Sequence, residues 1–286
     1  MRCREIRMGT IRSKALSLID RAANAYAAGP ELSGARAVCQ RLSTEGLNST
    51  ICYWNGESDF PKSVVDSYIE VLNEIPNLHS DCYLSVKAPA INFDLELLKV
   101  IIDRAASVGA LVHFDAMAPD TADATFNLIM RAREIYPKLG CTLPGRWRRS
   151  VFDADRAAEM GLRVRVVKGQ WADPSVDMNP QQGFLNVVDR LGAQRSSHVA
   201  VATHNPNLAR TALSRLRSTG TSCELELLYG LPSQTLIKIG RALNVPVRMY
   251  VPFGRAWLPY RLKKIPRNPR LVAWFIRDLC RTRTGR

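Results

Sequence analysis

Short apolar runs typical of strands alternate along the chain with longer amphipathic stretches typical of helices. Eight runs are short and rich in β-branched or alternating apolar residues, as strands require. The predicted strands cover residues 49–54, 81–87, 110–115, 138–143, 162–168, 198–203, 221–226 and 246–251. Their starts lie about 23–36 residues apart, which is the spacing of consecutive strand–helix units.

Helical patterns fill the gaps, with apolar residues recurring at steps of three and four. The clearest cover residues 94–107, 120–136, 153–160, 179–191 and 207–218. Asn179 before Pro180 predicts an N-cap with proline at the first helical position. Gly161, Gly192 and Gly220 stand where helix C-caps belong.

Strands alternating with helices in this number predict an α/β protein, a closed (β/α)8 barrel of the TIM type in a single domain. An open doubly wound sheet would need a glycine-rich phosphate loop, and the sequence has no GxGxxG. We expect residues 1–47 to form an N-terminal helical segment that closes the barrel bottom. Residues 48–286 would form the barrel itself.

The chain of 286 residues carries a net charge of +14, and much of it lies near the ends. A basic surface favours anionic lipid, nucleic acid or a phosphate-bearing ligand, although a solvated basic face is the simplest interpretation. No nucleic-acid recognition motif is present, so we expect no nucleic-acid partner. A peripheral membrane contact stays open.

Seven cysteines are scattered without any CxxC pair, which argues against a zinc site or a redox pair. This pattern favours a reducing, cytoplasmic compartment, with peripheral attachment at the inner membrane surface as the other option. Only four histidines occur. His113 and Asp115 would share the inner face of the third strand, but no HxH or HExxH spacing supports a metal, so none is predicted.

The predicted strand ends are unusually polar, and in a (β/α)8 barrel the carboxyl ends of the strands carry the chemistry. The polar residues there are Asn55, Lys87, Asp115, Lys168, Thr203, His204, Asn205, Glu226 and Tyr250. Each alone has a structural explanation: Lys87 and Asp115 as an ion pair, or His204 as a helix cap. Burying so many polar groups is costly without a ligand.

The residue types indicate an anionic ligand. Arg165 and Lys168 lie along the fifth strand. Residues 203–205 open a helix, where free backbone N–H groups favour a phosphate. These residues suit a flavin dinucleotide, yet they do not by themselves separate a flavin from a sugar phosphate.

Several motifs resemble the successive strand ends of the proline dehydrogenase family. They are SVKAPAINF, VHFDA, VRVVKGQWAD, VATHN, ELELLYGL and RMYVPFGRAWLPYRLKKIPRNP, in the order of that family. The resemblance covers roughly residues 22–275. It implies an FAD-dependent, monofunctional barrel enzyme that oxidises proline to Δ1-pyrroline-5-carboxylate by hydride transfer to flavin N5. A quinone or another electron acceptor would then take the electrons.

The resemblance also implies roles for individual residues. The substrate side would comprise Lys87, Asp115, Tyr250, Tyr260, Lys263 and Lys264. The FAD side would comprise Arg165, Lys168, Gln170, Thr203, His204, Asn205, Glu226 and Leu228.

The chain departs from the family pattern at several of these positions. Lys263 and Lys264 replace two arginines that bind the substrate carboxylate, and lysine lacks the planar bidentate fork. Glu226 and Gln170 replace a glutamine and an alanine. We therefore expect proline or a proline-like cyclic secondary amine as substrate. The alternatives are a divergent barrel that acts on a different substrate and a catalytically silent ligand-binding or interaction protein.

Overall fold

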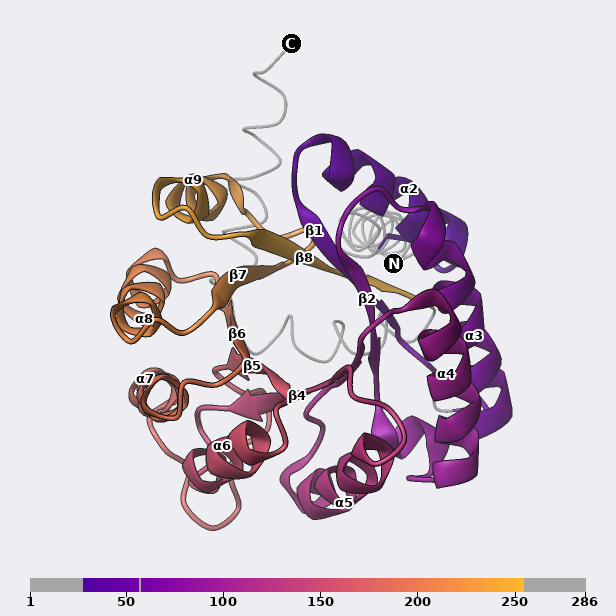
Figure 1. Ribbon diagram of the computed structural model, residues 1–286, viewed down its shortest axis with the longest axis horizontal. Coiled ribbons are helices and arrows are strands. Elements are labelled where there is room, and N and C mark those ends of the chain that lie inside the picture. The colour runs from indigo at the N-terminus through magenta and orange to yellow at the C-terminus, as the bar shows by residue number, and fades with distance from the viewer. Residues whose placement is uncertain (1–27, 57, 255–286) are drawn as a thin grey trace, which may run out of the picture.

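The computed structural model describes residues 28–56 and 58–254; Tyr260, Lys263 and Lys264 lie outside these ranges. In this part of the chain eight parallel strands close into a barrel in sequence order, with helices around it (Figure 1). The strands are β1 (Asn48–Tyr53), β2 (Cys82–Val86), β3 (Val112–Phe114), β4 (Leu139–Pro144), β5 (Arg163–Val167), β6 (His198–Ala202), β7 (Cys223–Leu228) and β8 (Val247–Phe253).

The helices lie outside the barrel; α2 (Leu32–Thr44) precedes β1, and each later helix follows one strand. The later helices are α3 (Pro61–Glu74), α4 (Leu95–Val108), α5 (Ala122–Arg133), α6 (Ser150–Glu159), α7 (Pro180–Ala193), α8 (Pro206–Ser218) and α9 (Gln234–Ala242). Three short 3-10 turns are η1 (Ile75–Asn77), η2 (Ala88–Ile91) and η3 (Pro119–Thr121). The predicted (β/α)8 barrel is confirmed, and each predicted strand matches an observed one to within about two residues at its ends.

Some local predictions differ from the structure. Gly192 lies inside α7 and not at its C-cap, because the helix continues to Ala193. The chain just before α2 is not helical, and Gly29 there has a φ of +103°. Residues 28–31 of the predicted N-terminal helical segment are therefore not helical, and its residues 1–27 lie outside the described part.

Two helix N-termini at the carboxyl end of the barrel are capped by asparagine. The Asn179 side chain accepts hydrogen bonds from Gln181 N and Gln182 N, as the sequence predicted. Asn205 caps α8 in the same way. These caps fix the first residues of α7 and α8, the helices that follow β5 and β6.

The apolar core lies between the barrel and its helices. Val164 and Val166 of β5 and Val199 and Val201 of β6 are all fully buried on this outer side. Strand residues alternate between the two faces of the sheet, so the residues between these valines point into the barrel. The side chains on the inner face of the barrel therefore do not belong to this apolar core.

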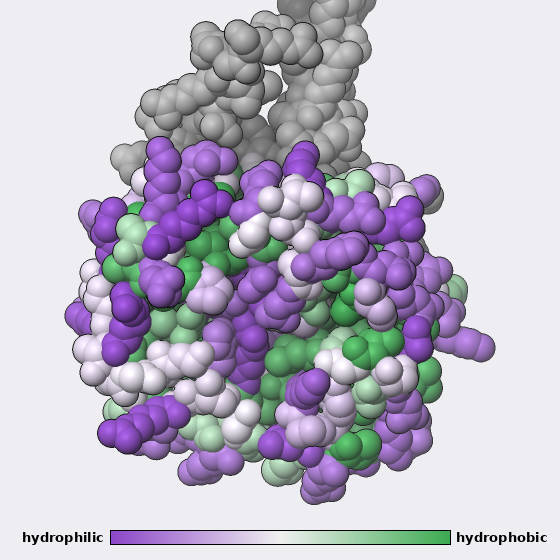
Figure 2. All heavy atoms as spheres, turned by 45° about the horizontal axis from the view of Figure 1, so that its top comes forward, coloured by the Kyte–Doolittle hydropathy of each residue, from purple (hydrophilic) through white to green (hydrophobic). Residues whose placement is uncertain are grey.

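The outer surface is mainly hydrophilic in the view of Figure 2, with apolar residues in small separate groups. Phe60 and Phe152 are the most exposed large apolar side chains of the described residues. Over the same residues, no helix has both the length and the apolar character needed to cross a bilayer.

Candidate functional site

The interior of the barrel is polar, whereas branched apolar side chains usually fill such barrels. The strand registers place one side chain beside the next around the inner face. These inner residues are Thr50, Cys52, Tyr83, Ser85, His113, Asp115, Thr142, Arg163, Arg165, Glu224, Glu226, Arg248 and Tyr250. Polar groups are buried only at a cost unless they are paired, and here they form two hydrogen-bonded layers.

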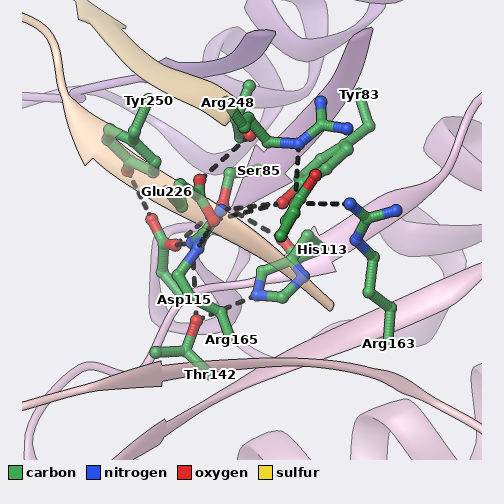
Figure 3. Close-up of polar contacts among 12 residues, drawn as sticks. Tyr83, Ser85, His113, Asp115, Thr142, Arg163, Arg165, Glu226, Arg248 and Tyr250 are labelled. Carbon is green, nitrogen blue, oxygen red and sulfur yellow. Dashed lines mark hydrogen bonds and ion pairs between the residues drawn. The ribbon is translucent and has the colours of Figure 1, made fainter. Parts of the chain in front are cut away.

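Arg165 is the centre of the layer nearer the carboxyl ends of the strands. Its Nε donates to Glu226 Oε2 at 2.7 Å, and its Nη1 donates to Asp115 Oδ1 at 2.7 Å. Nη2 reaches the Tyr83 hydroxyl at 3.3 Å. Figure 3 shows the guanidinium between the two carboxylates. Burial disfavours its charge, but the nearby Glu226, Tyr83 and Asp115 outweigh that effect and raise the pKa of Arg165 well above its usual value.

Asp115 receives hydrogen bonds from several directions. Ser85 Oγ, Arg165 Nη1 and the Tyr250 hydroxyl each donate to it at 2.7 Å, and Cys52 Sγ lies 3.5 Å from Oδ2. Its side chain keeps 14% of its surface exposed, whereas that of Arg165 keeps 4%. Asp115 therefore lies nearer to solvent than the arginine that orients it.

Lys87 approaches the same cluster from β2 without pairing directly with Asp115. Its Nζ donates to the Tyr53 carbonyl at 2.6 Å and to Cys52 Sγ at 3.1 Å. Burial raises the pKa of Cys52 to about 11, so the protonated thiol can in turn donate to Asp115. Cys52 thus connects the lysine to the carboxylate.

The substrate-side residues within the described ranges, Lys87, Asp115 and Tyr250, therefore meet in one cluster. The residues that bridge them were not identified from the sequence: Cys52, Tyr83, Ser85, Thr50 and Thr142. For Tyr83 and Ser85 the signal was available, because they lie four and two residues before Lys87 and therefore on the same face of the strand. Burial raises the pKa of Tyr250 well above its usual value, and the Asp115 charge adds to this shift.

The predicted FAD-side residues of β6 and β7 hold the rim of the barrel together. His204 Nε2 accepts from Leu228 N at 2.9 Å, so Nδ1 carries the proton that faces the Pro232 carbonyl at 3.2 Å. Burial lowers the pKa of His204, and the positive charge of Lys168 lowers it further. Thr203 Oγ1 accepts from Asn205 N at 3.2 Å.

The start of α8 differs from the sequence-based expectation of free N–H groups. The Asn205 side chain already accepts from Asn207 N and Leu208 N, and Pro206 has no N–H. The first turn of this helix is therefore capped from within the chain.

Lys168 is a charged group at this rim for which residues 28–56 and 58–254 supply no ion-pair partner. It is half-buried, it lies close enough to His204 to act on its titration, and no acceptor within the described residues pairs with its ammonium group. Gly169 follows it with a φ of +93°, and an added Cβ would lie 2.8 Å from Pro144 Cβ. Next to it, Gln170 is exposed and its carbonyl accepts from Arg146 Nη1 at 3.1 Å.

The second ionic layer lies toward the amino ends of the strands. Arg248 is fully buried and donates to Glu224 Oε1 at 2.9 Å and to the Ser49 carbonyl at 2.5 Å, and it pairs with Asp81. Arg163 also pairs with Glu224. These buried charges compensate one another, so this layer closes the barrel beneath Arg165. In the described part of the chain, no group of three His, Cys, Asp or Glu residues is placed to hold a metal ion.

No family model matches the chain. Proline dehydrogenase 1 of Bacillus subtilis (strain 168) is 22% identical over 274 residues, which cover 90% of this chain and 90% of that protein. Proline dehydrogenase of Deinococcus radiodurans is 22% identical over 280 residues, covering 90% of this chain and 89% of the relative. The resemblance to the proline dehydrogenases, inferred from the strand-end motifs, is thus confirmed along most of the chain.

Solved structures share the fold. Proline utilization A from Bdellovibrio bacteriovorus, in a structure inactivated by N-propargylglycine, matches with a TM-score of 0.75 and 15% identity, over 88% of this chain. Proline utilization A from Corynebacterium freiburgense matches with a TM-score of 0.68 and 14% identity, over 90% of this chain. The present chain spans 32% of each of those chains, so the similarity concerns about one third of each of those longer proteins.

Proposed function

We propose that this chain is an FAD-dependent dehydrogenase that oxidises proline, or a close cyclic secondary amine, to the imine. One observation carries the proposal. Lys87, Asp115 and Tyr250, which come from three separate strands or strand ends, converge on Arg165 in a single hydrogen-bonded cluster. Similarity to proteins named proline dehydrogenase along nine tenths of the chain supports the same activity. With proline as substrate, the product would be Δ1-pyrroline-5-carboxylate.

The donor chemistry of the rim fits a flavin dinucleotide. Lys168 offers a half-buried ammonium group with no acceptor among the described residues, and such a group suits an anionic ligand. Gln170, Thr203 and Leu228 lie on the same rim and would border the cofactor. His204 and Asn205 would act indirectly, because their side chains are occupied in holding the strand ends.

The cofactor would accept the hydride from the carbon next to the substrate nitrogen. The contribution of the chain is alignment. Asp115, fixed by Ser85, Arg165 and Tyr250, presents one oriented carboxylate to the amine side of the substrate. Lys87 has two of its three donors occupied by Tyr53 and Cys52, which leaves one for a ligand.

The remaining assignments belong to the same proposal. Tyr260, Lys263 and Lys264 would complete the substrate side, with the two lysines facing the carboxylate of the substrate. A quinone or another acceptor would take the electrons. The net charge of +14 supports a peripheral contact at the anionic inner membrane surface, and the scattered cysteines support a cytoplasmic location.

Anaerobic reduction of the FAD-loaded protein tests the proposal. L-Proline, or a related cyclic amine from a panel that includes compounds without a carboxylate, should bleach the flavin absorbance. Asp115→Asn should retain FAD and slow the bleaching about a hundredfold or more, because alignment depends on this carboxylate. Asp155→Asn is the matched control, since Asp155 pairs with Arg190 on the surface. Bound FAD that no cyclic amine reduces would contradict the proposal and favour a silent binding protein.

A further inference from the structure

Arg165 and Glu226 form an ion pair almost completely removed from solvent. The two side chains keep 4% and 2% of their surfaces exposed, and Nε lies 2.7 Å from Oε2. We infer that Glu226 is a positioning residue that cancels the charge of Arg165 and holds its guanidinium below the barrel mouth. A ligand bound at the carboxyl ends of the strands would then contact Asp115, Tyr250 and Lys87, and not an unpaired arginine. This inference rests on the proposed function, because the ligand concerned is the flavin.

The hydrogen bonds of Arg165 leave little of it for a ligand. A guanidinium has five N–H donors. Nε is used by Glu226, and Nη1 donates to Asp115 and lies 3.4 Å from both Ser85 Oγ and Thr142 Oγ1. Nη2 is 3.3 Å from the Tyr83 hydroxyl. At most one N–H therefore stays unpaired, and the group is fixed from three sides.

Glu226 is itself held in place. The Thr50 hydroxyl donates to Oε1 at 3.1 Å, and the Tyr83 hydroxyl lies 3.4 Å from Oε2. Tyr83 cannot easily move, because Arg163 and Arg248 stack over its ring at 5.0 and 4.3 Å (Figure 3). The carboxylate therefore keeps one position and pins the Nε edge of Arg165.

The charge of this cluster should act on the flavin. A positive charge near the ring stabilises the reduced anion and so raises the reduction potential. Glu226 opposes that effect, because it adds a compensating negative charge to Arg165 within a poorly screened interior. Removing the negative charge while keeping the side-chain shape makes the cluster one unit more positive.

Glu226→Gln tests this reasoning, and Glu224→Gln is its matched control. Glu224 lies two residues earlier on β7, points into the barrel on the same face, and also pairs with two arginines. Both substitutions remove one buried carboxylate, but only Glu226 belongs to the layer nearer the carboxyl ends of the strands, where the flavin is proposed to bind. After FAD affinity and thermal unfolding are checked, the midpoint potential of the bound flavin is measured.

We expect Glu226→Gln to shift the flavin reduction equilibrium about tenfold toward the reduced form. Glu224→Gln should stay near the wild-type potential, and Glu226→Asp should restore it. If Glu226→Gln does not fold, the double variant R165Q/E226Q replaces it. The flavin midpoint potential of this double variant should match that of the wild type, because the two charges removed cancel each other. A lower potential would overturn the inference, because the charge of Arg165 would then act on the flavin without being cancelled by Glu226.

The outcomes separate this inference from the proposed function. A wild-type protein that binds no FAD would overturn both. FAD binding with equal potentials in the two single variants would overturn the inference alone, because Glu226 would then be only a structural partner of Arg165. A rise confined to Glu226→Gln supports the inference.

Discussion

His113 is a neutral histidine enclosed among arginines. It is fully buried on β3, and its Nε2 lies 2.9 Å from Thr142 Oγ1. Burial lowers its pKa well below the usual value of 6.5, and the positive charges of Arg165, Arg163 and Arg248 add to the effect. The folded protein therefore cannot take up a proton here that the unfolded chain binds readily.

Because of His113, the folded protein should become less stable as the pH is lowered. Below about pH 6.5 the unfolded chain binds a proton at His113 and the folded chain does not, so protonation favours unfolding. The unfolding free energy should fall by about 1.4 kcal/mol for each pH unit below that point. His113→Gln should make this pH dependence less steep. A part of it should remain, because the lowered pKa of His204 acts in the same direction. Denaturant unfolding between about pH 5 and 7.5 measures it; an unchanged slope in the variant would contradict the account.

Helix α7, which follows β5, is held against the end of β4 by a close contact between two glycines. Gly183 of α7 packs against Gly145 after β4, and an added Cβ would lie 1.7 Å from the Gly145 carbonyl oxygen. The loop between β5 and α7 is held at the same place by Arg146, whose Nε and Nη2 donate to Asp177 at 2.7 and 2.5 Å. This contact fixes the loop that carries Gln170.

Gly183→Ala should destabilise the protein by about 3 kcal/mol, because backbone cannot yield as a side chain can. Gly192→Ala on the same helix is the control. There the added Cβ would meet Thr219 Oγ1 at 3.1 Å, and the gain in helix propensity of about 1 kcal/mol offsets the crowding. Chemical denaturation compares the two variants. Equal losses would show that the glycine contact does not hold α7.

At the scale of elements, the sequence was sufficient for the eight strands, because period-two alternation and turn spacing are local signals. Helices α3 and α9 were not identified individually from the pattern. Gly192 was misplaced, because α7 continues through it to Ala193 and a glycine inside a helix gives the same local signal as one at its end.

At the scale of the whole molecule, the site depends on contacts that no local pattern contains. Thr50 and Glu226 are 176 residues apart, yet their side chains form a hydrogen bond inside the barrel. The sequence showed which residue types stand at the strand ends, so Lys87, Asp115 and Tyr250 could be predicted. It could not show that Arg165 is paired with Glu226, because strand tilt and register decide which inner side chains meet.

Two ionic layers thus fill the interior of the barrel: Arg248 with Glu224 toward the amino ends of the strands, and Arg165 with Asp115, beside Tyr250, toward the carboxyl ends. The proposed function requires a flavin at the carboxyl ends of these strands. Titration of the purified protein with FAD, followed by flavin fluorescence, tests this most directly. We expect saturable quenching at one FAD per chain, weakened by Lys168→Ala. Fluorescence that stays that of free FAD throughout the titration would contradict the account.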